Sequence, residues 1–302
     1  MGERQATLMR KKESSAAVGK KRHPARKALL IVVLIIAVGI GLLCAWVPIQ
    51  NMALRAKYVP EFQTVIAPFA GEAYSEPLPE QVASMDLDPD VTVNKLFVNG
   101  IPLYECYKDD GTQKPLIIVM HDSSNTKEAY VGEAAWYASM GYYALTVDED
   151  GCGENESDVT FLKAYTEATV YESDTLIEYY NGVEQADAAD FSLTGASQGG
   201  HLCYYYGEYG KYKPYAIMPM GGSVHDTIRH PERFLDVYIL CGMGAEDDRC
   251  VSVREFEERL TALGGGRGIF RYYEGLRHED LLPDYYDERN AFLEAHLTGR
   301  NG

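Results

Sequence analysis

The sequence predicts an α/β fold in which helices flank one mostly parallel sheet. Short apolar segments alternate with amphipathic segments from residue 91 to the C-terminus, and this alternation is typical of strands that are joined by helices. The segment at 195–199, Gly-Ala-Ser-Gln-Gly, stands between a strand-like and a helix-like stretch. About 210 residues follow position 91, which is enough for one domain with a well-buried core.

Eight strands are expected in the sheet. The first two form a hairpin, because residues 91–98 and 101–108 flank Asn99-Gly100, a dipeptide that favours a tight turn between antiparallel strands. Six further strands are expected around Leu116, Tyr142, Phe191, Tyr215, Val237 and Ile269. Helices are expected at 127–140, 166–180, 253–263 and from Pro283 to near Leu297.

The segment at 195–199 is typical of a turn that presents a serine nucleophile. Residues 191–194 favour a buried strand and residues 200–206 favour a helix, which is the context that the Gly-x-Ser-x-Gly motif requires. Gly195 and Gly199 leave room for a serine held at strained backbone angles. A small glycine turn without catalytic function is the alternative, and the flanking segments favour the nucleophile.

Candidate partners for Ser197 follow it in the order acid and then histidine. The apolar stretch at 237–241 leads into a loop with three consecutive acidic residues at 246–248, and His278 stands just past the last expected strand. This order resembles that of the α/β-hydrolase superfamily. The resemblance covers roughly residues 91–297.

Two upstream segments are similar to the same superfamily. Residues 115–128 resemble the strand and His-Gly loop that supplies one oxyanion donor, with Asp122 where glycine is usual. Residues 140–154 resemble the next strand and its Asp-x-x-Gly-x-Gly turn. Their Gly-Cys-Gly lacks the third glycine of a dinucleotide-binding fingerprint. The resemblance therefore implies the α/β-hydrolase fold without a nicotinamide site.

The resemblance also implies the roles of a catalytic triad. Ser197 is the expected nucleophile and His278 the base that takes its proton. Asp248 is the expected orienting acid, because the family's aspartate typically stands three residues before a valine, here Val251. Asp247 is the alternative acid.

Two backbone N–H groups are expected to bind the oxyanion of the tetrahedral intermediate. By resemblance these belong to Gln198, directly after the nucleophile, and to Ser123 in the loop after the Leu116 strand. The expected site contains no metal ion and no cofactor. His121 and His201 are expected to be buried and hydrogen-bonded rather than catalytic, and a disulfide between Cys152 and Cys250 is an open alternative.

The N-terminal part of the chain predicts a membrane anchor. Residues 28–47 contain no charged side chain and are long enough to span the hydrocarbon core of a bilayer. An uncleaved anchor is favoured over a cleaved signal peptide, which has a shorter apolar region. Residues 1–27 contain nine Lys or Arg residues, whereas only Arg55 and Lys57 lie soon after the span, so the tail is expected in the cytoplasm and the rest outside the cell.

The expected organisation and charge narrow the function. A basic tail (1–27), an anchor (28–47), a stalk or extension (48–90) and a catalytic domain (91–302) are expected in that order. The chain has a net charge of −17 and the tail +7, so the remainder carries −24. A body this acidic does not bind nucleic acid electrostatically.

The expected function is a serine hydrolase that acts on carboxylic esters at the cell surface. A serine peptidase of the prolyl-oligopeptidase type and a noncatalytic binding module are the alternatives, and the sequence leaves the oligomeric state open. The short connection at 220–236 predicts a minimal lid over the site. An open site of this kind favours short acyl groups.

Overall fold

The computed structural model describes residues 31–41, 65–155, 167–224, 228–278 and 283–300. The chain divides into two units, Met1–Ile49 and Gln50–Gly302. In the first unit, residues 31–41 form a helix with exposed apolar side chains. No helix within the described ranges is both long and apolar enough to cross a membrane. The anchor expected at 28–47 extends beyond the described residues at both ends.

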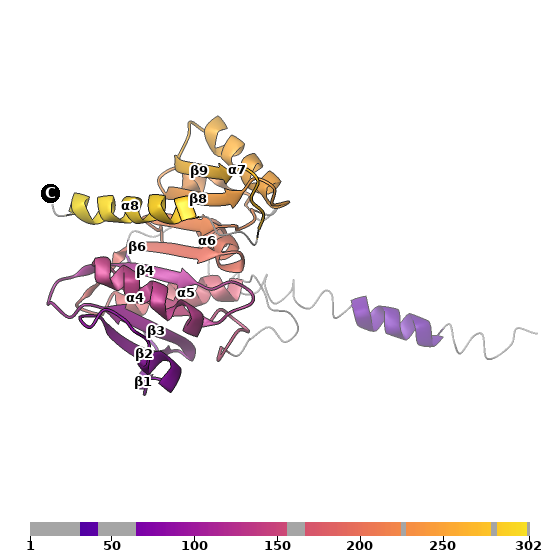
Figure 1. Ribbon diagram of the computed structural model, residues 1–302. Coiled ribbons are helices and arrows are strands. Elements are labelled where there is room, and N and C mark those ends of the chain that lie inside the picture. Colours follow the sequence, from indigo (N-terminus) through magenta and orange to yellow (C-terminus); the bar gives the residue numbers. More distant parts are fainter. Residues whose placement is uncertain (1–30, 42–64, 156–166, 225–227, 279–282, 301–302) are drawn as a thin grey trace, which may run out of the picture. The chain divides into compact units, whose positions relative to one another are not determined.

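A nine-stranded sheet forms the centre of the second unit (Figure 1). The strand order is β1-β2-β3-β5-β4-β6-β7-β8-β9. Strand β2 (Thr92–Val98) pairs antiparallel with β1 (Ala73–Glu76) and with β3 (Ile101–Tyr107), and β3 also pairs antiparallel with β5. All remaining pairs are parallel, and they join β4 (Lys114–Met120), β5 (Tyr143–Val147), β6 (Ala186–Ala196), β7 (Ala216–Met220), β8 (Tyr238–Gly244) and β9 (Arg267–Tyr273).

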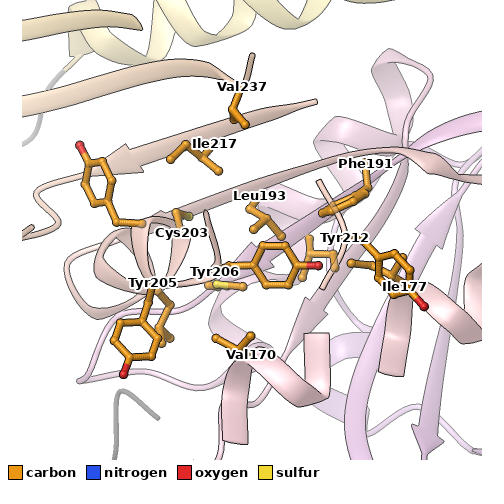
Figure 2. Packing of buried hydrophobic residues seen from close by; sticks show 14 of the residues in the cluster. Val170, Ile177, Phe191, Leu193, Cys203, Tyr205, Tyr206, Tyr212, Ile217 and Val237 are labelled. Carbon is orange, nitrogen blue, oxygen red and sulfur yellow. The ribbon is translucent and has the colours of Figure 1, made fainter. Parts of the chain in front are cut away.

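Helices cover both faces of this sheet. Helices α4 (Val131–Met140) and α8 (Pro283–Arg300) contribute to one buried apolar cluster, and α5 (Glu167–Tyr180), α6 (Gln198–Tyr209) and α7 (Cys250–Ala262) contribute to the other. Figure 2 shows part of the second cluster, where side chains of β6 and β7 meet those of α5 and α6. Every residue of β4 is buried, as expected for a parallel strand that helices cover on both faces.

The expected hairpin at the start of the domain is confirmed. Asn99 and Gly100 have φ values of 50° and 80°, and Val98 pairs with Ile101 on either side of them. Positive φ at both central residues gives the turn the twist that antiparallel strands require. The Asn-Gly dipeptide therefore sets the register of β2 and β3.

One expectation about the sheet is wrong, because the sheet has nine strands rather than eight. The additional strand, β1, lies in the segment at 48–90, for which a stalk or extension is expected. All four residues of β1 are exposed, so no alternation of apolar and polar residues marks this strand in the sequence. The short helix α3 (Glu80–Ala83) also precedes residue 91 and buries Val82.

The connection between β7 and β8 forms no large lid in its described part. Among residues 221–224 and 228–237, the only helical element is the 3₁₀ helix η2 (Pro231–Phe234). The alternative of a Cys152–Cys250 disulfide is wrong, because neither of these buried cysteines forms a disulfide.

Candidate active site

Ser197 occupies a strained turn between β6 and α6. Its φ of 53° and ψ of −106° lie in a region that non-glycine residues rarely adopt. The Ser197 N–H donates to the carbonyl oxygen of Met220 at 2.8 Å, and the His201 N–H donates to the Ser197 carbonyl at 3.0 Å. A Cβ atom at Gly199 would collide with the carbonyl oxygen of Met120, so glycine at this position lets the turn pack against the end of β4.

A chain of hydrogen bonds links Ser197 to His278 and a buried carboxylate. The Ser197 Oγ lies 2.8 Å from His278 Nε2, and His278 Nδ1 lies 2.7 Å from Asp247 Oδ2. The side chain of Asp247 is fully buried, whereas that of His278 is 23 % exposed. A hydroxyl, an imidazole and a carboxylate in this order can generate a nucleophile at neutral pH.

The expected pairing of Asp248 with His278 is wrong, and Asp247 occupies that position. The Asp248 side chain is 97 % exposed and lies 3.9 Å from the Arg249 guanidinium. The difference arises in the turn between β8 and α7. The Cys250 N–H donates to the Asp247 carbonyl at 3.0 Å, and the Arg249 N–H donates to Asp247 Oδ1 at 2.9 Å. This turn directs Asp247 inward and its neighbour into solvent.

The surroundings of Asp247 favour its ionised form. Burial alone raises the pKa of the Asp247 carboxyl, but the hydrogen bonds from the Arg249 backbone and the His278 side chain outweigh burial and hold the pKa below its ordinary value. Asp247 is therefore a carboxylate at neutral pH, and it can accept the Nδ1–H of His278.

The two expected oxyanion donors lie on segments that flank the Ser197 turn. Gln198 is the first residue of α6 and is buried, and Ser123 is exposed in the loop after β4. The first N–H groups of a helix lack intrahelical acceptors and can bind negative charge. The contact of Gly199 with Met120 and His121 brings the end of β4 beside the start of α6.

Asp122 organises the loop that carries Ser123. Its Oδ1 accepts the Ser124 N–H at 2.7 Å, and its Oδ2 accepts the Asn125 amide at 2.6 Å and the Tyr130 hydroxyl at 2.7 Å. Asp122 does not need the backbone freedom of the glycine that is usual here, because among the described residues only Asn99 and Ser197 combine a side chain with positive φ. The aspartate instead holds the loop through its carboxylate.

A buried polar group that the sequence analysis missed lies next to Gln198. The Gln198 side-chain amide donates to Glu149 Oε2, and the Glu149 N–H donates to His121 Nε2 at 3.3 Å. Burial raises the pKa of the Glu149 carboxyl well above its ordinary value, and the Gln198 hydrogen bond only partly opposes this. The only local sequence feature that could have indicated Glu149 is its position directly after Asp148.

Lys127 connects the loop after β4 to the loop after β5. Its Nζ lies 2.6 Å from Asp148 Oδ2 and 2.8 Å from Glu154 Oε2, and its backbone N–H donates to Asp148 Oδ1 at 2.9 Å. The Lys127 and Asp148 side chains are fully buried. These contacts join the two segments directly before Glu149, whose side chain contacts Gln198.

Of the other histidines within the described residues, His121, His201 and His296 are buried and hydrogen-bonded, and His230 is exposed. His201 is buried and its Nδ1 lies 2.8 Å from the Ser223 carbonyl, and His121 Nδ1 lies 2.7 Å from the Asp122 carbonyl. The expectation that both are buried and hydrogen-bonded is confirmed. His230 is exposed and contacts Glu232, whereas His225 lies outside the described residues.

The fold has clear counterparts among solved structures, although the sequence matches no family model and no curated protein. An acetyl xylan esterase from Paenibacillus sp. R4 superimposes with a TM-score of 0.60 at 16 % identity, over 82 % of this chain and 92 % of that one. Acetyl xylan esterase 1 from Thermoanaerobacterium sp. JW/SL YS485 gives 0.59 at 12 % identity, over 82 % and 93 %.

Esterase B from Lactobacillus rhamnosis gives a TM-score of 0.51 at 11 % identity, over 73 % of this chain and 92 % of that one. At identities this low, the similarity concerns the fold alone. The chain therefore has the α/β-hydrolase fold.

Proposed function

We propose that this protein is a serine hydrolase that cleaves carboxylic esters through an acyl-enzyme at Ser197. The observation that carries the proposal is the continuous hydrogen-bond chain from Ser197 Oγ to His278 and on to Asp247, with separations of 2.8 and 2.7 Å. A decayed site would be expected to lose at least one of these contacts. The intact chain thus favours an enzyme over a binding module.

The proposed reaction follows from the positions of these three side chains. Ser197 Oγ attacks the ester carbonyl while His278 Nε2 takes the hydroxyl proton, and Asp247 stabilises the resulting imidazolium. The N–H groups of Gln198 and Ser123 are proposed to bind the oxyanion. The intermediate then collapses, His278 protonates the departing alcohol, and water activated by His278 hydrolyses the acyl-enzyme.

Small-molecule esters with short acyl groups are the proposed substrates. The similar structures include two acetyl xylan esterases and an esterase. The only helical element in the described part of the β7–β8 connection is η2, which packs against the C-terminal end of α6, where Phe234 meets Gly207. This part of the connection therefore offers little apolar surface for a long acyl chain at Ser197. Both observations favour esters over the peptide substrates of prolyl oligopeptidases.

We further propose that the N-terminal segment anchors the enzyme in the cell membrane with the catalytic unit outside. The support is the uncharged stretch at 28–47 and the excess of basic residues before it. The exposed apolar side chains of the helix at 31–41 are consistent with a lipid environment. The cleaved form of the same export signal would leave the catalytic unit outside without an anchor.

Active-site labelling tests the proposed enzyme. A fluorophosphonate probe is expected to modify the full-length protein in mild detergent, and Ser197→Ala is expected to abolish both labelling and hydrolysis of p-nitrophenyl acetate, with a loss approaching about a million-fold. Ser75→Ala, which changes an exposed serine on β1, is the matched control and retains both. Labelling that persists in Ser197→Ala would exclude Ser197 as the nucleophile.

A further inference from the structure

Three buried side chains near the proposed active site form a compact group of potential metal ligands. His121 follows β4, and Glu149 and Cys152 lie in the loop after the neighbouring strand β5. A nitrogen of His121, a carboxylate oxygen of Glu149 and the Sγ of Cys152 all lie within 4.8 Å of one another. The three residues are 0 %, 1 % and 3 % exposed, so they form an interior site and not a surface cluster.

The backbone holds two of these side chains in a fixed relation. The Cys152 N–H donates to the Glu149 carbonyl at 2.8 Å, and this closes a turn with Gly151 at a φ of 76°. The glycine supplies a conformation that residues with a side chain rarely adopt. The turn therefore keeps Glu149 and Cys152 together before any ligand binds.

The His121 ring is oriented so that one nitrogen faces this turn. Its Nδ1 lies 2.7 Å from the Asp122 carbonyl, and a carbonyl accepts only a protonated nitrogen, so Nδ1 carries the hydrogen. Nε2 is then an acceptor that the Glu149 N–H approaches at 3.3 Å, and a metal ion at Nε2 would replace this long hydrogen bond. Histidine ligands to metals are commonly held in this way, with the second nitrogen donating to a backbone carbonyl.

Glu149 provides an independent indication of a ligand. Its Oε2 accepts the Gln198 amide, but its Oε1 is buried and has no hydrogen-bond partner in the described part of the chain. Leaving a buried polar atom without a partner is costly, and native structures rarely do so. An ion bound between the three side chains would satisfy this oxygen.

We propose that His121, Glu149 and Cys152 bind a zinc ion. Imidazole, thiolate and carboxylate are the ligands that Zn²⁺ takes in proteins, whereas Mg²⁺ and Ca²⁺ require oxygen ligands. One thiolate and one carboxylate neutralise the two charges of the ion, so the loaded site is neutral in the interior. The Gln198 amide nitrogen lies 4.0 Å from Cys152 Sγ, and a water molecule would complete the tetrahedral set.

This zinc ion would have a structural or regulatory role that is separate from ester cleavage. The nucleophile, base and acid proposed above are Ser197, His278 and Asp247, and none of them belongs to the zinc group. When zinc binds, Cys152 releases its thiol proton to solvent, and Glu149 releases any proton that it carries and binds as the carboxylate. Because Gln198 contacts both Glu149 and Cys152, the ion would stiffen the start of α6.

Cobalt binding tests the proposal without relying on activity. The full-length protein in mild detergent is stripped with a chelator and titrated with Co²⁺. The expected result is a thiolate-to-cobalt charge-transfer absorption in the near ultraviolet that saturates at about one equivalent and disappears when Zn²⁺ is added. Absence of this absorption in the folded parent protein would overturn the proposal.

Matched variants locate the site. Cys152→Ser is expected to abolish the absorption, whereas Cys250→Ser, which changes an equally buried cysteine at the start of α7, retains it. Glu149→Gln keeps the thiol and is expected to weaken Co²⁺ binding at least ~10-fold, which tests the site even if Cys152→Ser does not fold. Absorption that persists in Cys152→Ser, or unchanged affinity in Glu149→Gln, would contradict the assignment.

Discussion

At the scale of single residues, Asp247 differs from its acidic neighbours Glu246 and Asp248 in the orientation of its side chain. The turn between β8 and α7 buries the Asp247 carboxylate against His278 and leaves that of Asp248 97 % exposed. A spacing rule that counts residues to a downstream valine selects the wrong neighbour here. The backbone hydrogen bonds of the turn decide which carboxylate faces the histidine.

Asp247→Asn is expected to lower kcat for p-nitrophenyl acetate by on the order of 10⁴, because the amide would hold His278 in the wrong tautomer. Asp248→Asn is the matched control and is expected to leave kcat within about twofold, as for other solvent-exposed substitutions. Steady-state kinetics on both variants checks this ranking. The opposite ranking would return the role to Asp248.

Asp122→Gly is expected to lower kcat by on the order of 10², although glycine is usual at this position in the superfamily, since misplaced oxyanion donors cost about this much. The substitution removes the acceptors for Ser124, Asn125 and Tyr130 and frees the loop that carries Ser123. Asp122→Asn, which keeps one acceptor oxygen, is expected to fall between the parent and the glycine variant. Equal or higher kcat in Asp122→Gly would show that the loop needs no such support.

At the scale of secondary-structure elements, the contact between α5 and α6 contains a buried acid, Asp174. Asp174 on α5 accepts the Tyr206 hydroxyl of α6 at 2.7 Å and the Lys211 N–H at 3.1 Å. Burial raises the pKa of Asp174 to about 7, because these hydrogen bonds offset the loss of solvation only in part. Asp174 is therefore neutral in the folded protein at mildly acidic pH.

The free energy of unfolding is expected to fall as pH rises from about 4 to about 7, because the folded state then holds a proton on Asp174 that the unfolded chain has lost. Above about 7 this contribution is constant. The resulting change in the free energy of unfolding over this pH range is at most about 4 kcal/mol. Asp174→Asn, which cannot titrate, is expected to lack this slope, and denaturant unfolding of both proteins across the range measures it.

An exposed-acid control separates this effect from general titration. Asp236→Asn removes a carboxylate that is 75 % exposed and is expected to retain the slope of the parent. A slope that survives in Asp174→Asn would assign the pH dependence to other groups.

Elements with a local cause were predictable from the sequence. The Asn99-Gly100 turn fixes its hairpin through the positive φ of two residues, and the glycines around Ser197 identify the strained turn. Strand β1 was not predictable, since its four residues are exposed and only pairing with β2 makes them a strand.

The candidate site was predictable as far as residue order determines it. Serine and histidine are single candidates in their segments, whereas Asp247 and Asp248 differ only in the direction of their side chains. His121 and Glu149 are 28 residues apart, and they meet because β4 and β5 are parallel neighbours. No local spacing in the sequence could indicate that contact.

The openness of the proposed site is a property of the whole catalytic unit. His278 remains 23 % exposed, and the described part of the β7–β8 connection contributes only η2. Specificity constants for p-nitrophenyl esters from about two to about sixteen carbons are expected to peak at about four carbons or fewer, since each additional CH₂ gains about 0.8 kcal/mol only where it is buried. A maximum at long chains would require an apolar roof from another part of the chain.

Protease accessibility tests the proposed topology of the chain. With nine basic residues before the uncharged stretch at 28–47, protease added to intact cells is expected to digest the catalytic unit and leave the N-terminal tail protected. Permeabilised cells, in which both sides become accessible, are the control. A catalytic unit that is digested only after permeabilisation would place it on the cytoplasmic side.

Strand β1 has a mechanical consequence if the N-terminal segment anchors the protein as proposed. It is the first element of the sheet in chain order, so tension on the N-terminal segment would enter the sheet there. Five inter-strand spacings, or about 24 Å, separate β1 from β6, which carries the strand end before Ser197. β1 pairs over only four residues and buries none of them. Under tension it can therefore separate from β2 while the strands that position Ser197 stay in register.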